Sequence, residues 1–262
     1  MILSFSFGKN WEEFVKKHYS EERVAASKKH ILDFLGLQNL NGKYFLDIGC
    51  GSGLSSLAAF YAGTKKILSF DIDENAVKTT EKLRESGGKP DNWIVKQGSI
   101  LDADFLSKIP KADIVYAWGS LHHTGDMWKA IENSAKLMKR NGLFYVALYN
   151  TTPKSAYWLK IKKRYSNAGE MEKRLMEFWY LFYKWLPGYT LSGNNPIKYI
   201  LDYKKDRGMS FLTDARDWLG GLPFEHTSKE KMKAFCRKVK LGCTKIWHSE
   251  NVANTEYLFK RR

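Results

Sequence analysis

Short apolar runs alternate with longer polar segments over much of the first 150 residues. Five runs have the length of buried strands: 44–48, 66–70, 93–97, 114–118 and 143–148. Three intervening segments have the length and spacing of helices: 54–62, 74–85 and 126–139. Strands joined by helices predict right-handed βαβ units, so this region predicts an open, doubly wound α/β fold with a mostly parallel sheet.

The pattern divides the chain into four parts. Residues 1–42 are polar with helical spacing and predict an N-terminal helical cap, followed by the sheet-forming core at 43–150. Residues 151–220 interrupt the alternation after the fifth strand and predict a helical insertion. Within 221–262, a helix at 228–240 and strands near 244–248 and 256–260 are expected, which makes a sheet of seven strands.

The insertion is basic and aromatic. Residues 154–208 hold 12 Lys and Arg against 5 Asp and Glu. We expect the insertion to be a lid over an acceptor pocket, with basic groups that meet phosphate, or a packed helical subdomain with solvated charges. Six aromatic residues are candidates for the pocket or for the core of the lid: Trp158, Phe178, Trp179, Phe182, Trp185 and Tyr189.

Composition restricts the class of protein. The chain has 262 residues, 44% of them hydrophobic, which is enough for a sizeable core. No apolar run is long enough to cross a membrane, and the start lacks the pattern of a secretory signal. Three cysteines without a CxxC pair predict neither a disulfide framework nor a zinc site, and no metal is expected. A cytoplasmic protein is the expectation.

The strongest motif is Leu46-Asp-Ile-Gly-Cys-Gly-Ser-Gly53, at a strand-to-helix turn. Its glycines allow positive φ and close approach of a ligand to the backbone. Asp71 ends the second strand, where a carboxylate can accept hydrogen bonds from two ribose hydroxyl groups. Asp47 precedes the first glycine, and its charge suits the amino group of an amino-acid-bearing ligand but would repel a pyrophosphate.

These residues closely resemble those of class I S-adenosylmethionine-dependent methyltransferases over about residues 43–150. The resemblance implies a seven-stranded, Rossmann-like sheet and S-adenosyl-L-methionine as cofactor. It also implies adenine contacts after the third strand, where Ser99 replaces the aspartate of many members. The cofactor-binding residues predicted from motif and resemblance together are Phe7, Trp11, Asp47, Gly49, Cys50, Gly51, Ser52, Gly53, Asp71, Ile72, Ser99, Ile100, Trp118 and Gly119.

Beyond the core, further segments resemble a subgroup associated with small-molecule O-methylation. The segments are FGKNW near the start, WGSLHHTGDMW, ALYN, and the late MSFLTDARDWLGGLPFE. The resemblance implies an acceptor such as a sugar, a nucleotide-linked or a phenolic intermediate of surface-polysaccharide or secondary-metabolite biosynthesis. Many amino-methylating enzymes of nucleic acids carry an Asn/Asp-Pro-Pro-aromatic tetrad after the fourth strand, where this chain has Trp118-Gly-Ser-Leu121. This difference argues against methylation of adenine or amide nitrogen.

Removal of a proton from an acceptor hydroxyl calls for a general base, and histidine has a suitable pKa. His122 and His123 follow the fourth strand and are the catalytic candidates, although both are equally compatible with a structural role in the turn before Asp126. The candidates for acceptor contacts are Tyr149, Asn150, Asp217 and Trp218.

The net charge of +15 is compatible with simple solubility or with an anionic partner. A small-molecule acceptor, with or without phosphate, is the leading hypothesis. A lipid-tailed acceptor at a membrane surface and an RNA acceptor are the alternatives.

Overall fold

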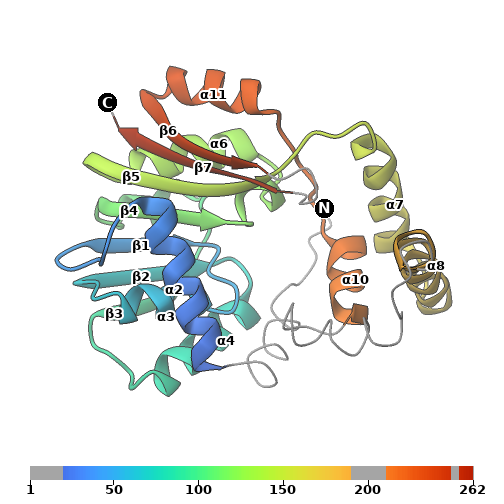
Figure 1. Ribbon diagram of the computed structural model, residues 1–262, viewed down its shortest axis with the longest axis horizontal. Helices are drawn as coiled ribbons and strands as arrows, with labels where there is room; N and C mark the ends of the chain where they lie inside the picture. Colours follow the sequence, from blue (N-terminus) through green and yellow to red (C-terminus); the bar gives the residue numbers. More distant parts are fainter. Residues whose placement is uncertain (1–19, 190–210, 249–253, 262) are drawn as a thin grey trace.

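A computed structural model describes residues 20–189, 211–248 and 254–261. Its centre is one sheet of seven strands in the order β3-β2-β1-β4-β5-β7-β6 (Figure 1). The strands are β1 Tyr44–Ile48, β2 Lys66–Asp71, β3 Trp93–Gln97, β4 Ala112–Trp118, β5 Met138–Tyr149, β6 Leu241–His248 and β7 Asn254–Arg261. β1 to β5 are parallel, and β7 runs antiparallel to both β5 and β6. The predicted fold class is confirmed.

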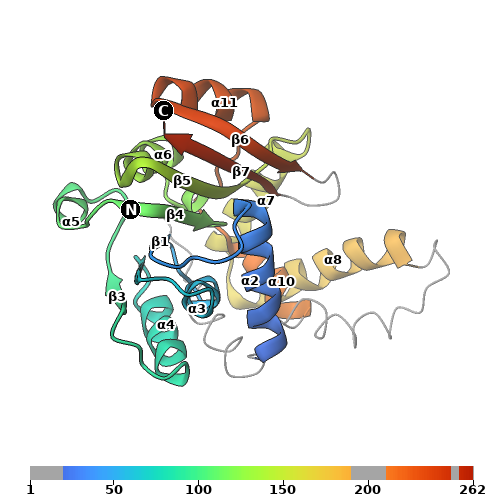
Figure 2. The same ribbon diagram turned by 60° about the vertical axis from the view of Figure 1, so that its left-hand side comes forward.

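Helices cover both faces of this sheet. α2 Glu21–Leu35, α3 Leu54–Tyr61 and α4 Glu74–Ser86 pack on one face, and α2 lies beside α3 (Figure 2). α5 Ala103–Ser107, α6 Met127–Lys136 and α11 Lys229–Lys238 pack on the other. The central strands β1 and β4 are apolar on both sides because both of their faces are buried under helices.

Side chains at the N-cap positions explain where several helices begin. Asp73 accepts a hydrogen bond from the Asn75 N–H, and Ser228 accepts one from the Lys231 N–H. The predicted helix over 126–139 starts correctly, with Asp126 as the cap, but it ends at Lys136. Met138 pairs with Ala112 in the sheet, so the turn at Asn141-Gly142 lies inside β5. The prediction of that helix end was wrong.

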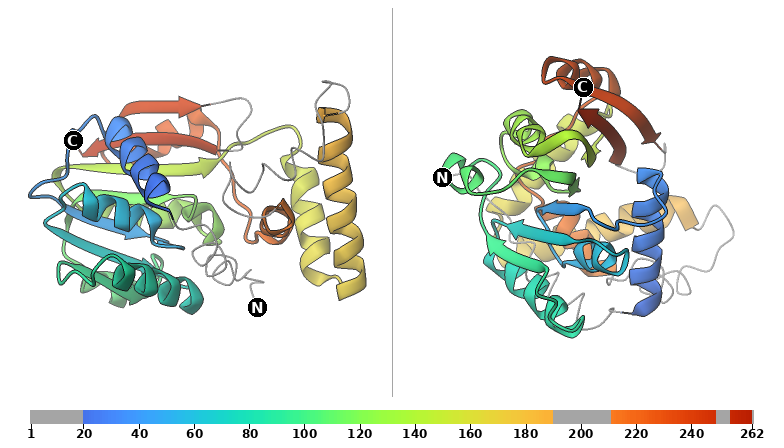
Figure 3. Two further views of the ribbon diagram at one scale, coloured as in Figure 1. Left: turned by 60° about the horizontal axis from the view of Figure 1, so that its bottom comes forward. Right: turned by 90° about the vertical axis from the view of Figure 1, so that its left-hand side faces the viewer.

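The described part of the insertion contains α7 Ser155–Asn167, α8 Glu170–Tyr189 and α10 Phe211–Gly220, beyond the carboxyl ends of the parallel strands (Figure 3, left). A small core joins them, made by Tyr165, Tyr180, Ala215 and Leu219 with Trp158 and Trp218 against it. No helix in the described part of the chain is long and apolar enough to span a membrane.

The aromatic residues of α8 point in different directions. Tyr180 is buried in the small core, whereas Phe178, Trp179 and Phe182 are exposed. Successive positions of a helix face different sides, so a run of aromatic residues cannot all turn inward. The expectation that these three line a pocket or core was wrong, and the side chains of Trp185 and Tyr189 lie outside the described residues.

Candidate functional site

The glycine-rich turn connects β1 to α3 at the edge where all parallel strands end. Gly49, Gly51 and Gly53 have φ of 71°, 54° and 80°, a region that side chains rarely adopt. A Cβ atom on Gly49 would lie 2.3 Å from the Cβ of Ser120. Ser120 also donates a 2.7 Å hydrogen bond to the carbonyl of Ile48. The turn after β1 is therefore packed directly on the turn after β4.

Asp71 connects this turn to the end of β2. One carboxylate oxygen accepts a hydrogen bond from the Gly51 N–H at 3.1 Å, and the other accepts one from the Asp73 N–H at 3.0 Å. Burial raises the pKa of Asp71, and the two N–H groups oppose this effect. The carboxylate is thus held at the rim of the glycine turn, with lone pairs left for further donors.

Asp47 lies deeper than the other predicted residues. Its side chain is buried and accepts a 2.6 Å hydrogen bond from Ser56, and burial raises its pKa to about 7. It lies beneath the turn, in a network that continues from Ser56 to Ser69. Its predicted pairing with a ligand's amino group stays a prediction.

The remaining predicted cofactor residues differ in what they expose. Ile72 is 67% exposed beside Asp71, and Trp118 is exposed at the end of β4. Gly119 has φ of 76° and open space where a Cβ would stand. Cys50, Ser52 and Ile100 have buried side chains and can offer only backbone groups, and Ser99 accepts a hydrogen bond from the Leu101 N–H. Phe7 and Trp11 lie outside the described residues.

The two histidines lie on the short helix η1 (Leu121–His123), directly after β4. The centroid of the His122 ring lies 3.8 Å from that of Tyr149, with the two rings tilted by 39°, and the His123 ring lies 5.4 Å from Tyr149. His123 Nδ1 lies 2.7 Å from the carbonyl of Pro223. Burial lowers the pKa of His123 to about 4 and that of His122 well below its ordinary value, and nearby Lys162 lowers both further. Both rings are therefore neutral at neutral pH.

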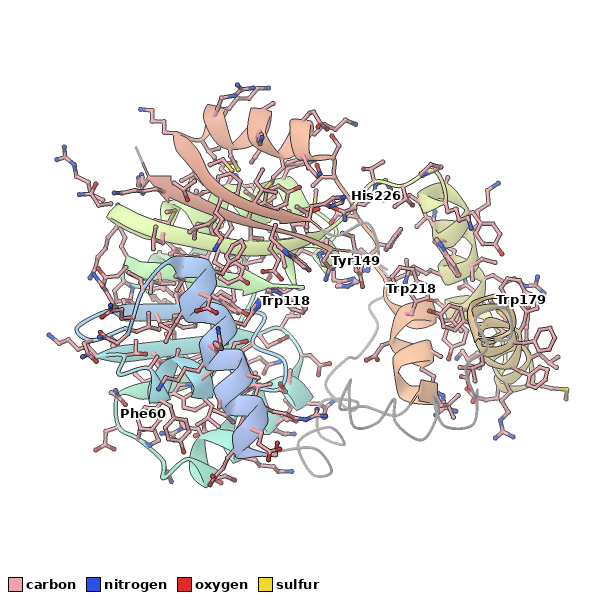
Figure 4. The ribbon with its side chains drawn as sticks, in the orientation of Figure 1. Phe60, Trp118, Tyr149, Trp179, Trp218 and His226 are labelled. Atoms are coloured by element: carbon pink, nitrogen blue, oxygen red, sulfur yellow. The ribbon has the colours of Figure 1, made fainter. Side chains whose placement is uncertain are left out.

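An aromatic chain runs from the histidines into the insertion. Tyr149 is 5.4 Å from Phe224 and 5.8 Å from Trp218, and Trp218 is 5.5 Å from Trp158. Figure 4 shows Tyr149 and Trp218 between the end of the sheet and the helices of the insertion. The predicted acceptor residues Tyr149 and Trp218 are thus brought together with both histidines.

The other two predicted acceptor residues have different neighbours. Asn150 accepts a hydrogen bond from Thr255 and lies 3.3 Å from a ring nitrogen of His248, so its side chain is engaged with β6 and β7. Asp217 is half-buried on α10 and raises the pKa of Lys162.

Lys162 and Phe224 belong to this cluster. The sequence predicts Lys162, with Lys160, Lys163 and Arg164, only as a basic group of the insertion that meets phosphate, and it gives no role to Phe224. Nζ of Lys162 donates a hydrogen bond to the Trp218 carbonyl and lies over the rings of Trp218, at 4.3 Å, and Phe224, at 4.9 Å. A signal did exist for Lys162, because it shares one helix face with Trp158 and Tyr165.

Residues 46–144 match a family model described as a methyltransferase domain. The match covers less than half of the chain and identifies this segment as a methyltransferase domain. The chain is similar to ribosomal protein L11 methyltransferase from Helicobacter hepaticus, with 35% identity over 118 residues, 41% of this chain and 36% of the relative. For the protein of the same name from Acinetobacter baumannii, identity is 34% over 116 residues, 44% and 37% of the two chains. The matches span little more than a third of the length of these curated relatives.

Solved structures of methyltransferases are similar to this chain in fold. Magnesium protoporphyrin IX methyltransferase from Synechocystis, with bound S-adenosylhomocysteine, has a TM-score of 0.57 at 13% identity, covering 97% of this chain and 94% of the other. An O-methyltransferase family protein from Burkholderia thailandensis has a TM-score of 0.56 at 12% identity, covering 91% and 57%. At these identities the likeness is one of fold.

Proposed function

We propose that the protein is an S-adenosylmethionine-dependent methyltransferase that methylates an oxygen atom of a small molecule. The observation that carries the proposal is the position of Asp71, which is bonded to the Gly51 N–H at the carboxyl edge of the sheet. The glycine turn and this carboxylate lie at the point where the strand order reverses, between β1 and β4, where open α/β sheets bind ligands.

The residues present fit such a donor. Asp71 can accept hydrogen bonds from the ribose hydroxyl groups, and the exposed side chain of Ile72 offers an apolar surface to adenine. The open space at Gly119 leaves room for a ligand beside the turn after β4. Bound S-adenosylmethionine supplies a methyl group activated by a positively charged sulfur. The chain itself has to hold the acceptor in line and exclude water.

The surroundings of η1 favour a small acceptor that carries a hydroxyl group. Tyr149, Trp218 and Phe224 offer aromatic surfaces next to the neutral histidines. His123 and His122 are proposed to accept or orient the proton of the hydroxyl. Tyr149 ends β5, Trp218 comes from α10 of the insertion and Phe224 from the loop before α11, so the rings meet at the end of the sheet where an acceptor must meet the donor.

A protein side chain is the second candidate acceptor. It is favoured by the curated relatives, which are named for methylation of a ribosomal protein. Those matches cover less than half of this chain. They therefore support donor binding more strongly than they support a protein acceptor.

A transfer experiment separates these acceptors. The protein is incubated with S-adenosylmethionine labelled in the methyl group and a lysate of its source, and the label is followed into small-molecule, polysaccharide, lipid, RNA and protein fractions. Label in small molecules or polysaccharide supports the proposal, and label confined to protein supports the second candidate. Label confined to RNA or lipid contradicts both. An Asp71→Asn variant is the control for transfer that depends on the donor site.

A further inference from the structure

Lys162 is a lysine without access to solvent. Its exposed fraction is 0%, although it lies on a helix whose next two residues, Lys163 and Arg164, are exposed. A lysine has the longest flexible charged side chain and is almost never fully buried unless it is paired. Among the described residues, Nζ donates its hydrogen bond to the Trp218 carbonyl, a neutral acceptor. Packing alone does not account for this residue, since methionine fills a similar volume without the cost of burying an amine.

The electrostatics around Lys162 favour its neutral form. Burial lowers the pKa of Lys162 to about 7, and the acidic group that faces it, Asp217 of α10, opposes this only partly. His122 and His123 of η1 also face Lys162 electrostatically, and their rings are neutral. A neutral amine that donates one hydrogen bond to the Trp218 carbonyl keeps a lone pair that can accept a proton.

Further buried polar atoms in the same cluster have no hydrogen-bond partner among the described residues. Nε1 of Trp218 is in this state, and the ring nitrogens of His122 have no partner of good geometry beyond a weak contact with the Ala147 backbone. Such atoms cost free energy unless something satisfies them, and their clustering is typical of a site for a polar ligand. Tyr149 neighbours His122, Trp218 and Phe224, and Nζ of Lys162 lies over the last two rings, so a ligand of this cluster should be flat and apolar with one polar end.

We infer that Lys162 and the rings of Tyr149, Trp218 and Phe224 form a subsite for an aromatic hydroxyl compound, with Nζ of Lys162 as the acceptor of the hydroxyl proton. The inference rests on the proposed function and narrows its acceptor to a phenol. It leaves the two histidines to orient the hydroxyl and assigns the proton to Lys162. The hydroxyl O–H bond breaks, its proton bonds to the lone pair of Nζ, and its electron pair stays on oxygen. That pair then forms the bond to the methyl carbon, and the pair of the broken carbon–sulfur bond stays on sulfur. The ammonium group gives up its proton during product release, when water can reach the subsite.

The probe for this subsite is 7-hydroxycoumarin, a phenol whose absorption moves to longer wavelength when it ionises. Near neutral pH the free probe is mostly un-ionised. On binding to the wild-type protein we expect the absorption band of the anion, because the proton moves to Lys162. The matched ligand 7-methoxycoumarin has no such proton and should bind without this change. In Lys162→Met the anion band should be lost, and in Lys163→Met, next to it on the exposed face, it should remain.

Three results would overturn the inference: no binding of 7-hydroxycoumarin to the wild type, binding without the anion band, or an unchanged anion band in Lys162→Met. Binding of S-adenosylmethionine, measured by calorimetry on the same proteins, reports on the fold of the variants and on the proposed function separately. Loss of donor binding in the wild type refutes the proposed function, whereas retained donor binding without the anion band refutes only the phenol subsite. A nuclear magnetic resonance titration of lysine side-chain carbons adds a readout on the wild type. The signal missing in Lys162→Met should shift when the hydroxycoumarin is added, and a signal that does not shift contradicts proton transfer.

Discussion

Replacement of the buried Lys162 by methionine should make the protein more stable at neutral pH. The folded state lowers the pKa of this lysine from 10.5 to about 7, a difference that corresponds to a cost on the order of 4 kcal/mol at neutral pH. The variant loses the hydrogen bond to the Trp218 carbonyl, which costs about 1–3 kcal/mol if the carbonyl stays unpaired. The net gain in free energy of unfolding is therefore about 1–3 kcal/mol.

The difference in stability between the wild type and Lys162→Met should depend on pH. Below pH about 7 both the folded and the unfolded wild type carry the proton on Lys162, so the full cost is present. Between about 7 and 10.5 only the unfolded state holds it, so wild-type stability rises with pH relative to Lys162→Met. Urea unfolding across this range measures the difference, with Lys163→Met as the exposed control. A gap between wild type and Lys162→Met that does not narrow as pH rises would refute the reasoning.

Three further predictions concern the donor turn and η1. Asp71→Asn should weaken S-adenosylmethionine binding by roughly one to two orders of magnitude, because a charged acceptor is lost. The exposed Asp91→Asn should leave the affinity unchanged. Equal affinities of the two variants in calorimetry would argue against the ribose contact. Gly49→Ala should lower the free energy of unfolding by about 1–3 kcal/mol, since the φ of Gly49 is 71° and a Cβ would clash with Ser120. Gly169 has free space around its Cβ position, so Gly169→Ala should change this free energy little. Similar losses for both variants in urea unfolding would contradict the clash. The ring of His123 should titrate near pH 4 by nuclear magnetic resonance, and a midpoint near 6.5 would show that the ring is not buried as described.

The donor side of the site could be predicted because its signals are local. A strand, three glycines and a helix follow one another within residues 44–61, and the sequence places Asp71 at the end of the next strand. In a parallel sheet the ends of neighbouring strands meet at one edge, so the contact between Asp71 and Gly51 follows from the order of elements.

The acceptor side could be predicted only in part, because its residues meet through the docking of separate helices. Lys162 and Trp218 are 56 positions apart, and their contact depends on how α7 packs against α10. The helical spacing of Trp158, Lys162 and Tyr165 does indicate which face of α7 is buried. It does not indicate that Phe224, from the loop before α11, lies over the lysine.

Local signals also failed where the sheet overrode them. The Asn141-Gly142 turn is a good helix stop, yet the chain leaves the helix after Lys136 because Met138 pairs with β4. Pairing between strands, which depends on residues far apart in the chain, decided that boundary.

The most direct test of methyl transfer to a small-molecule oxygen follows the methyl carbon itself. S-adenosylmethionine carrying ¹³C in the methyl group is incubated with the protein and the small-molecule fraction of its source, and carbon resonance distinguishes methyl groups bound to sulfur, nitrogen and oxygen. If the protein methylates an oxygen of a small molecule, the signal moves from sulfur to oxygen with the wild type and does so far more slowly with Asp71→Asn. A signal that stays on sulfur, or that appears on nitrogen or in the protein fraction, would contradict methylation of a small-molecule oxygen.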